Sequence, residues 1–257
     1  MADIAVATWS VRHALKDESI GFEGVADFLN ENNINFIEIN NKFTTPKELP
    51  GVIDLFEEYG ISTFQLTVDG NNFFQKKEKK RKEQFDFMKK WIDPASKKGV
   101  KYIRANMGRR LGFFRRSDKI ENLLATFHPI MQYIESKGMT FVFENHGGKS
   151  SDVEFQLKVK NEIPSEHFGY LLDMGNYRPK EEVYENIMKL GDAIKVVHAK
   201  AYGFDEQGHE SKLNYERIIS NLKKIGYDGF YSVEFEGRGY SDFEGTIGTI
   251  NLLRKYL

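Results

Sequence analysis

Four short stretches of this sequence place an acid or an imidazole directly after a run of apolar residues. They are "FVFENHGG" (141–148), "LLDMGNY" (171–177), "VVHAKAY" (196–202) and "YSVEFEG" (231–237). An ionisable group that is buried without a partner costs several kcal/mol or more. Each of these groups must therefore face water or meet a compensating charge, such as a bound cation. The residues in question are Glu144, Asp173, His198 and Glu234.

Three carboxylates and one imidazole form a hard, oxygen-rich ligand set. Such a set suits one divalent ion, Mn²⁺ or Mg²⁺ first, with Co²⁺ and Zn²⁺ also accepted because imidazole tolerates them. A divalent ion of this kind can chelate the carbonyl and the neighbouring hydroxyl of a sugar and act as a Lewis acid. The chemistry that follows is abstraction of a proton next to the carbonyl, giving an enediolate.

Side-chain alternation indicates which residues accompany the ligand set, because alternate residues of a strand share a face. Glu144 should point the same way as His146, and His198 the same way as Lys200. Glu144 and Glu234 are then the candidate acid/base pair. Lys200 or His146 can steady the developing oxyanion or carry a proton.

Further polar and aromatic residues lie at other predicted strand ends. Glu38 ends the run 34–39, and Arg104 and Asn106 share a face at the end of 100–106. These side chains can bind sugar hydroxyls or pair with one another. Trp9 follows the first run and can form an apolar wall against a sugar or belong to the core.

Eight β-rich runs that alternate with longer helical patterns must position all of these groups. The runs are 4–8, 34–39, 61–68, 100–106, 139–144, 168–173, 194–199 and 230–235. The clearest helical pattern has Ser117 as its N-cap, an apolar stripe from Ile120 to Ile134, and Gly138 as its stop. Glycines at 60, 99, 138 and 226 each precede a strand, as helix C-caps do, and the first three are spaced by 39 residues.

Strands that alternate with helices imply parallel pairing, and eight units in a chain of 257 residues match the size of a (β/α)8 barrel. A doubly wound open sheet is the alternative. No strand, however, is followed by a Gly-rich dinucleotide or P-loop signature. We therefore predict an α/β fold, a TIM barrel forming a single domain over residues 1–257, with the four motifs on consecutive strands at its active-site end.

The composition excludes several classes of function. The net charge of −1 gives no general reason to expect nucleic acid or an anionic membrane as a partner. The absence of cysteine excludes thiolate nucleophiles, disulfides and zinc–thiolate sites. The first residues show no secretion signal, and no window approaches the roughly 18 apolar residues of a membrane span. We expect a soluble cytoplasmic protein with a small-molecule sugar or hydroxyketone substrate, and a homo-oligomer is compatible with the sequence.

Two charged segments have competing interpretations. "KKEKKRKEQ" (76–84) contains glutamates and precedes an apolar helical pattern, which favours a solvated helix face over a nucleic-acid site. "RRLGFFRRS" (109–117) follows the fourth strand, with paired arginines around two phenylalanines. It can cover the site as a lid, take up a substrate phosphate or form a subunit contact, and these alternatives stay open.

The four motifs resemble the signature strand ends of the xylose-isomerase-like TIM-barrel superfamily. The resemblance is strongest to its sugar-phosphate isomerase/epimerase-type proteins, including the D-tagatose 3-epimerase-like enzymes. It covers nearly the whole chain, and the spacings of 29, 25 and 36 residues between the four ligands fit. The resemblance implies that Glu144, Asp173, His198 and Glu234 hold a divalent metal and that the two glutamates double as acid and base.

The sequence also departs from the epimerase pattern. Many of these epimerases have a histidine three residues after the aspartate, where this chain has Asn176, which can hydrogen-bond a substrate hydroxyl but cannot titrate. The pairs Glu144–His146 and His198–Lys200 also resemble 3-dehydroshikimate dehydratases of the same superfamily. We therefore expect a metal-dependent isomerase or epimerase acting on a ketose or related hydroxyketone. The alternatives are a metal-dependent dehydratase or lyase and a non-catalytic sugar-binding barrel.

Overall fold

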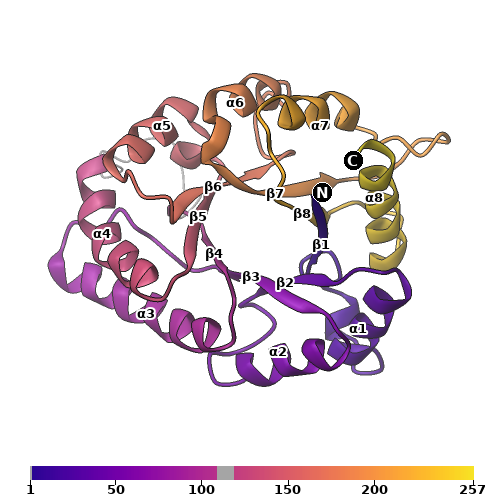
Figure 1. The fold of residues 1–257 in the computed structure, drawn as a ribbon, viewed down its shortest axis with the longest axis horizontal. Coiled ribbons are helices and arrows are strands. Elements are labelled where there is room, and N and C mark those ends of the chain that lie inside the picture. Colours follow the sequence, from indigo (N-terminus) through magenta and orange to yellow (C-terminus); the bar gives the residue numbers. More distant parts are fainter. Residues whose placement is uncertain (1, 109–118) are drawn as a thin grey trace.

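The computed structural model describes residues 2–108 and 119–257. Eight parallel strands close into a barrel in the order of the chain, and the last strand pairs with the first (Figure 1). Each strand begins and ends within two residues of the bounds predicted from the sequence. The strands are β1 (Asp3–Ala7), β2 (Phe36–Asn40), β3 (Ser62–Val68), β4 (Tyr102–Ala105), β5 (Thr140–Glu144), β6 (Phe168–Asp173), β7 (Ile194–Ala201) and β8 (Phe230–Phe235).

A helix follows each strand and lies on the outside of the barrel (Figure 1). This arrangement confirms the predicted single-domain (β/α)8 TIM barrel. The helices are α1 (Gly21–Glu31), α2 (Leu49–Glu58), α3 (Glu78–Lys97), α4 (Ile120–Ser136), α5 (Val153–Glu162), α6 (Glu182–Leu190), α7 (Tyr215–Lys224) and α8 (Asp242–Tyr256). Short 3₁₀ turns add η1 (Ala14–Lys16), η2 (Gly148–Ser151) and η3 (Gly191–Ala193).

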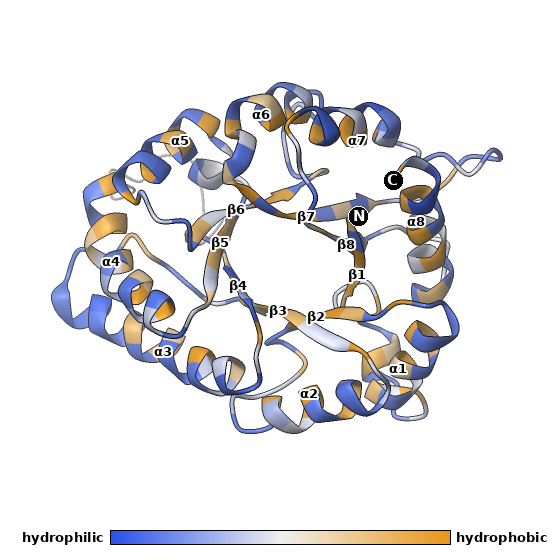
Figure 2. Cartoon of the chain, viewed as in Figure 1, coloured by the Kyte–Doolittle hydropathy of each residue, from blue (hydrophilic) through white to orange (hydrophobic). Residues whose placement is uncertain are grey.

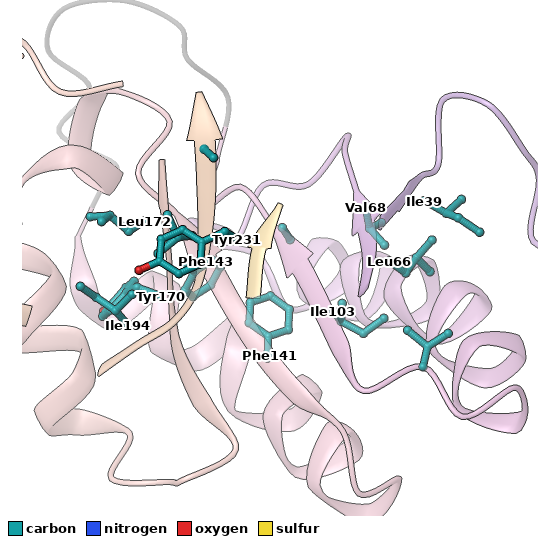
Figure 3. Packing of buried hydrophobic residues seen from close by; sticks show 14 of the residues in the cluster. Ile39, Leu66, Val68, Ile103, Phe141, Phe143, Tyr170, Leu172, Ile194 and Tyr231 are labelled. Carbon is teal, nitrogen blue, oxygen red and sulfur yellow. The ribbon is translucent and has the colours of Figure 1, made fainter. Parts of the chain in front are cut away.

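The main core lies between the barrel and the helices. Hydrophobic positions lie mainly on the strands and on the helix sides that face them (Figure 2). Apolar side chains on the outer faces of neighbouring strands, such as Leu66, Ile103 and Phe141, pack together there (Figure 3). Burial of this apolar surface is the main force that holds the helices against the barrel.

A second, smaller apolar cluster fills the floor of the barrel interior. It consists of Ala5, Phe64, Val142, Leu171 and Val196. Alternate residues of a strand share a face, so the side chains that follow Val142, Leu171 and Val196 on the inner face are polar. They are Glu144, Asp173 and His198. The barrel interior is therefore apolar towards the N-terminal ends of the strands and polar at their C-terminal ends, where the βα loops meet.

Local signals fix the ends of several helices. The four predicted C-cap glycines all have a positive φ, between 65° and 75°, as the left-handed cap conformation requires. Asn33 takes the same role after α1 with a φ of 54°. Helix α8 begins with a capping box formed by Ser241 and Glu244. Helix α4 begins at Ile120, and its predicted N-cap, Ser117, lies outside the described residues.

The two charged segments have different outcomes. Positions 76–80 are exposed, and the basic run continues into α3, as expected of a solvated helix face. The segment 109–117, for which a lid, a phosphate site and a subunit contact stay open, lies outside the described residues. Across residues 2–108 and 119–257, no helix is long and apolar enough to cross a membrane.

Candidate metal centre

Four buried side chains converge at the C-terminal ends of strands β5 to β8. Each offers one ligand atom, and these atoms all lie within 4.8 Å of one another. The strand register produces this arrangement, because Asp173 lies opposite His198 in the β6–β7 ladder while β5 and β8 lie on either side. The structure thus brings together the four residues that the sequence singled out, which are Glu144, Asp173, His198 and Glu234.

The His198 ring is held in one orientation. Its Nε2 lies 2.9 Å from Oε2 of Glu38, which is itself buried. Its Nδ1 faces the carboxylates, at 3.3 Å from Glu234 Oε2 and 3.5 Å from Glu144 Oε1. A histidine whose outer nitrogen is bound by a carboxylate presents the other nitrogen as a metal ligand.

The donor set fits a divalent cation. Four buried carboxylates surround the centre, against two buried cations, Arg104 and Lys200. With His198 neutral, these buried groups alone carry two uncompensated negative charges, and a divalent ion supplies the opposite charge. The buried atoms Asp173 Oδ2, His198 Nδ1 and Glu234 Oε2 make no hydrogen bond within the described chain, and the two carboxylate oxygens have only the Lys200 ammonium as an ion-pair partner apart from His198. Buried polar atoms of this kind need a partner, and this set can hold a metal ion.

Without a metal, protons balance the negative charge. Burial alone lowers the pKa of His198, but the neighbouring Glu38 and Glu234 outweigh it and raise that pKa to about 10. Burial raises the pKa of Asp173 to about 6, although Lys200 opposes this. Burial also favours protonation of Glu234, but Lys200 and His198 bring the pKa of its carboxyl well below the usual value.

Lys200 lies inside the cluster, where only 3% of its surface is exposed. Its ammonium group contacts Glu234 and lies 3.2 Å from Asp173 Oδ2 and 3.1 Å from Glu236 Oε2. Burial disfavours its charge, but the carboxylates outweigh burial and raise the pKa of Lys200 well above the usual value. Lys200 is therefore a permanent cation at this centre.

His146 is half-buried at the next inward position after Glu144. Its backbone N–H donates to Ser150 Oγ at 2.8 Å, while its ring makes no hydrogen bond with the residues that the structure describes. Burial, together with the Arg104 guanidinium, lowers the pKa of His146 to about 4. The ring is consequently neutral near pH 7 and free to meet a bound molecule.

Arg104 and Asn106 belong to a polar network on the β3–β4 side of the centre. Arg104 forms an ion pair with Glu144 and another with Asp69 Oδ1, the latter at 3.0 Å. Arg104 also donates to Asn106 Oδ1 at 3.2 Å. Asp69 was missed by the sequence reasoning. The alternation that selected Glu144 would have found it, because Gln65, Thr67 and Asp69 share one face at the end of β3.

The remaining predicted residues lie around the open C-terminal end of the barrel. Asn176 Nδ2 is 3.4 Å from Glu144 Oε1. Trp9 is half-buried, donates from Nε1 to Glu236 Oε1 at 2.8 Å and carries the Lys42 ammonium 4.4 Å above its ring. Glu38 lies deeper, and its position favours orienting His198 over contacting a substrate.

The chain is similar to a known protein family and to several solved structures. The family model described as xylose isomerase-like TIM barrel matches residues 17–256. The crystal structure of D-allulose 3-epimerase from Methylomonas sp. in complex with D-allulose superposes with a TM-score of 0.82, covering 100% of this chain and 97% of that one. The sequence identity is 14%, so this likeness shows the fold alone. Other similar structures are also of sugar epimerases and isomerases.

Two curated relatives match over shorter stretches. An uncharacterised protein of Methanocaldococcus jannaschii is 25% identical over 152 residues, which are 55% of this chain and 50% of that protein. The match thus spans about half the length of that relative. The C-glycoside deglycosidase alpha subunit of Arthrobacter globiformis is 41% identical over 59 residues, which are 23% of this chain and 16% of the subunit.

Proposed function

The chain belongs to the xylose isomerase-like TIM barrel family, and from that premise we propose that it is a divalent-metal-dependent sugar isomerase or epimerase. The proposed substrate is a ketose or a related hydroxyketone. The observation that carries the proposal is the convergence of three buried carboxylates and one imidazole whose ligand atoms lie within 4.8 Å of one another. The solved sugar epimerases and isomerases with the same fold support it.

Glu144, Asp173, His198 and Glu234 would hold one divalent ion, Mn²⁺ or Mg²⁺ by preference, with Co²⁺ and Zn²⁺ accepted by the imidazole. When bound, such an ion polarises a substrate carbonyl and fixes the neighbouring hydroxyl. The ion also supplies the positive charge that the buried carboxylates lack.

Glu144 and Glu234 are the proposed acid/base pair. They come from β5 and β8, on either side of Asp173 and His198, and can therefore flank a substrate. One carboxylate takes the proton from the carbon beside the carbonyl, and the other returns a proton to the opposite face, which inverts that carbon. Lys200 keeps Glu234 in its ionised form. The neutral His146 ring can donate a hydrogen bond to the oxyanion or carry a proton.

Residues around the open C-terminal end of the barrel supply the proposed substrate contacts. Trp9 offers an aromatic surface, and Arg104, Asn106 and Asn176 offer polar groups towards sugar hydroxyls. Glu38 is proposed as a positioning residue for His198. The cytoplasmic location and the homo-oligomeric state stay predictions.

Proton exchange in D₂O tests the proposed reaction. The Mn²⁺-loaded protein is incubated with ketoses, ketose phosphates and 3-dehydroshikimate, and the products are read by NMR. We expect deuterium beside a ketose carbonyl, and we expect Glu144→Gln and Glu234→Gln to abolish its incorporation. Absence of exchange with every compound, despite bound metal, would contradict the proposal.

A metal-dependent lyase is the second candidate. One observation favours it: Lys200 is buried against Glu234, and both act electrostatically on the neutral His146. A lyase removes the same proton but then expels a group from the adjacent carbon. In the same NMR experiment, conversion of 3-dehydroshikimate to an aromatic product would identify this chemistry.

The third candidate is a sugar-binding barrel without turnover. The Glu234→Gln variant distinguishes it from the two proposed enzymes. A pure binding protein should retain its affinity for the sugar in this variant. An enzyme should instead lose turnover by orders of magnitude.

A further inference from the structure

Three cations surround one tyrosine in the loops that follow β6 and β7. The Lys180 and Lys212 ammonium groups lie 4.1 Å and 4.6 Å from the centroid of the Tyr202 ring. The Arg178 guanidinium donates to the Gly175 and Tyr177 carbonyls, both at 2.6 Å, and interacts with the Tyr202 hydroxyl. Cations stacked on an aromatic face are held in place without being neutralised.

This group of cations has no ion-pair partner in the described part of the chain, although the Glu210 carboxylate acts on Lys180 from nearby. Within residues 2–108 and 119–257, no carboxylate forms an ion pair with Arg178, Lys180 or Lys212. The buried carboxylate close by, Glu210, accepts instead from the backbone N–H groups of Tyr202 and Lys212, at 2.9 Å and 2.5 Å. Burial lowers the pKa of Lys180, Glu210 opposes this, and the two neighbouring cations add to the lowering.

The cation group adjoins the metal centre. The Tyr202 hydroxyl donates to the Gly175 carbonyl at 3.3 Å, and the Gly175 N–H donates to Asp173 Oδ1 at 2.7 Å. A Cβ built on Gly175 would lie 2.7 Å from both the Tyr202 hydroxyl and Cγ of Lys200, so these side chains pack closely. Because both loops follow strand C-termini, the cations lie at the same end of the barrel as the four metal ligands.

We propose that Arg178, Lys180 and Lys212 form an anion subsite, so that the substrate carries a phosphate monoester or a carboxylate at the end remote from its carbonyl. This inference rests on the proposed function, whose site it extends. A guanidinium and two ammonium groups supply donors and charge for such an anion, with arginine able to bind it through two parallel hydrogen bonds. Arg178 and Lys212 are exposed and Lys180 is half-buried, so an anion can reach all three cations.

The first test compares substrates on matched variants. Lys180→Met/Lys212→Met removes two cations, while Lys158→Met, an exposed lysine of α5, serves as the control. Arg178 is left in place because it also binds the loop carbonyls. Deuterium exchange is measured with a ketose phosphate, a keto-uronate and the corresponding neutral ketose.

In the double variant, we expect KM for the anionic substrate to rise roughly tenfold or more, with kcat and the KM for the neutral ketose within about twofold of the wild type. The control should match the wild type throughout. The better of the two anionic substrates identifies phosphate or carboxylate as the group recognised. An unchanged KM for both anionic substrates would overturn the subsite.

The second test needs no turnover. Binding of inorganic phosphate to the metal-free protein is measured by calorimetry, so that no bound metal competes for the anion. We expect the double variant to bind phosphate roughly tenfold more weakly than the wild type and the control. Equal binding by all three proteins would contradict the subsite. Failure of every exchange reaction would contradict the proposed function instead, and phosphate binding would still decide the subsite.

Discussion

The Glu38 carboxylate binds Nε2 of His198 at 2.9 Å, although the two residues are 160 positions apart in the chain. Thr67 and Ser232 donate their hydroxyls to the same carboxylate, at 2.5 Å and 2.8 Å. The two hydroxyls therefore hold Glu38 in place, and Glu38 in turn fixes the His198 ring with Nδ1 towards the other three proposed ligands. This arrangement assigns Glu38 an orienting role that its place at a strand end does not reveal.

Replacing Glu38 with glutamine should weaken metal binding without unfolding the barrel. The amide is neutral and loses the charge-assisted bond to His198, so we expect the Mn²⁺ affinity to fall by about 10- to 100-fold. Free Mn²⁺ measured by EPR gives the affinity, and far-UV circular dichroism checks the fold. Glu58→Gln, an exposed position on α2, is the matched control. Equal affinities of Glu38→Gln and the wild type would refute the orienting role.

Metal affinity should rise with pH. The pKa of His198 is raised to about 10 in the metal-free protein, so a proton occupies the imidazole at neutral pH and a metal must displace it. We expect the dissociation constant for Mn²⁺ to fall by about tenfold per pH unit between roughly pH 7 and 9, with about one proton released per ion. Calorimetry in buffers of different ionisation enthalpy measures both quantities. A pH-independent affinity would show that His198 is not the group displaced.

The same raised pKa predicts how the metal-free fold responds to pH. A pKa that is higher in the folded state stabilises the protein fully below the ordinary histidine value of 6.5. That contribution should disappear as the pH rises towards about 10. Urea unfolding of the metal-free protein across this range, compared with His198→Gln, isolates the effect. The variant should show the smaller loss of stability with rising pH.

Lys200→Met should destabilise the metal-free protein much more than the metal-loaded one. Removing the buried ammonium leaves Asp173 and Glu234 without their cation, and breaking a buried ion pair costs about 3–5 kcal/mol. Bound Mn²⁺ compensates the same carboxylates and should reduce this loss. Urea unfolding with and without metal measures it, with Lys79→Met on the exposed face of α3 as control. Equal losses in both states would contradict this electrostatic coupling.

Gly175→Ala should disturb the junction between the metal centre and the cation group. The added methyl would lie 2.7 Å from Cγ of Lys200 and 2.7 Å from the Tyr202 hydroxyl, so both side chains must shift. We expect a loss of stability of about 1–3 kcal/mol. Gly51→Ala is the matched control, because its Cβ would meet nothing within 4 Å in α2, and it should be neutral or stabilising. Thermal unfolding of both variants provides the comparison.

The sequence predicts the barrel well because its signals are local. Apolar runs, amphipathic stripes and cap glycines each report one element, and eight such units match one known architecture. The four proposed ligands could also be selected locally, since alternation along each strand marks the face they share.

The polar pairings across the barrel could not be predicted in this way. Alternation selects Glu38 and Arg104 as inward-facing, but only the closed barrel shows that one meets His198 and the other meets Glu144. The cluster around Tyr202 depends on how two loops fold back beside each other. Such contacts depend on strand register and loop conformation, which residue types alone do not encode.

The position of Glu234 in the last strand has a consequence for how the protein matures. During synthesis, Glu144, Asp173 and His198 emerge before Glu234, and β8 must pair with both β7 and β1 before the fourth proposed ligand reaches the others. An incomplete chain therefore offers at most three donors. Tight metal binding would then begin only when the barrel closes. It would distinguish fully folded molecules from truncated or misfolded ones.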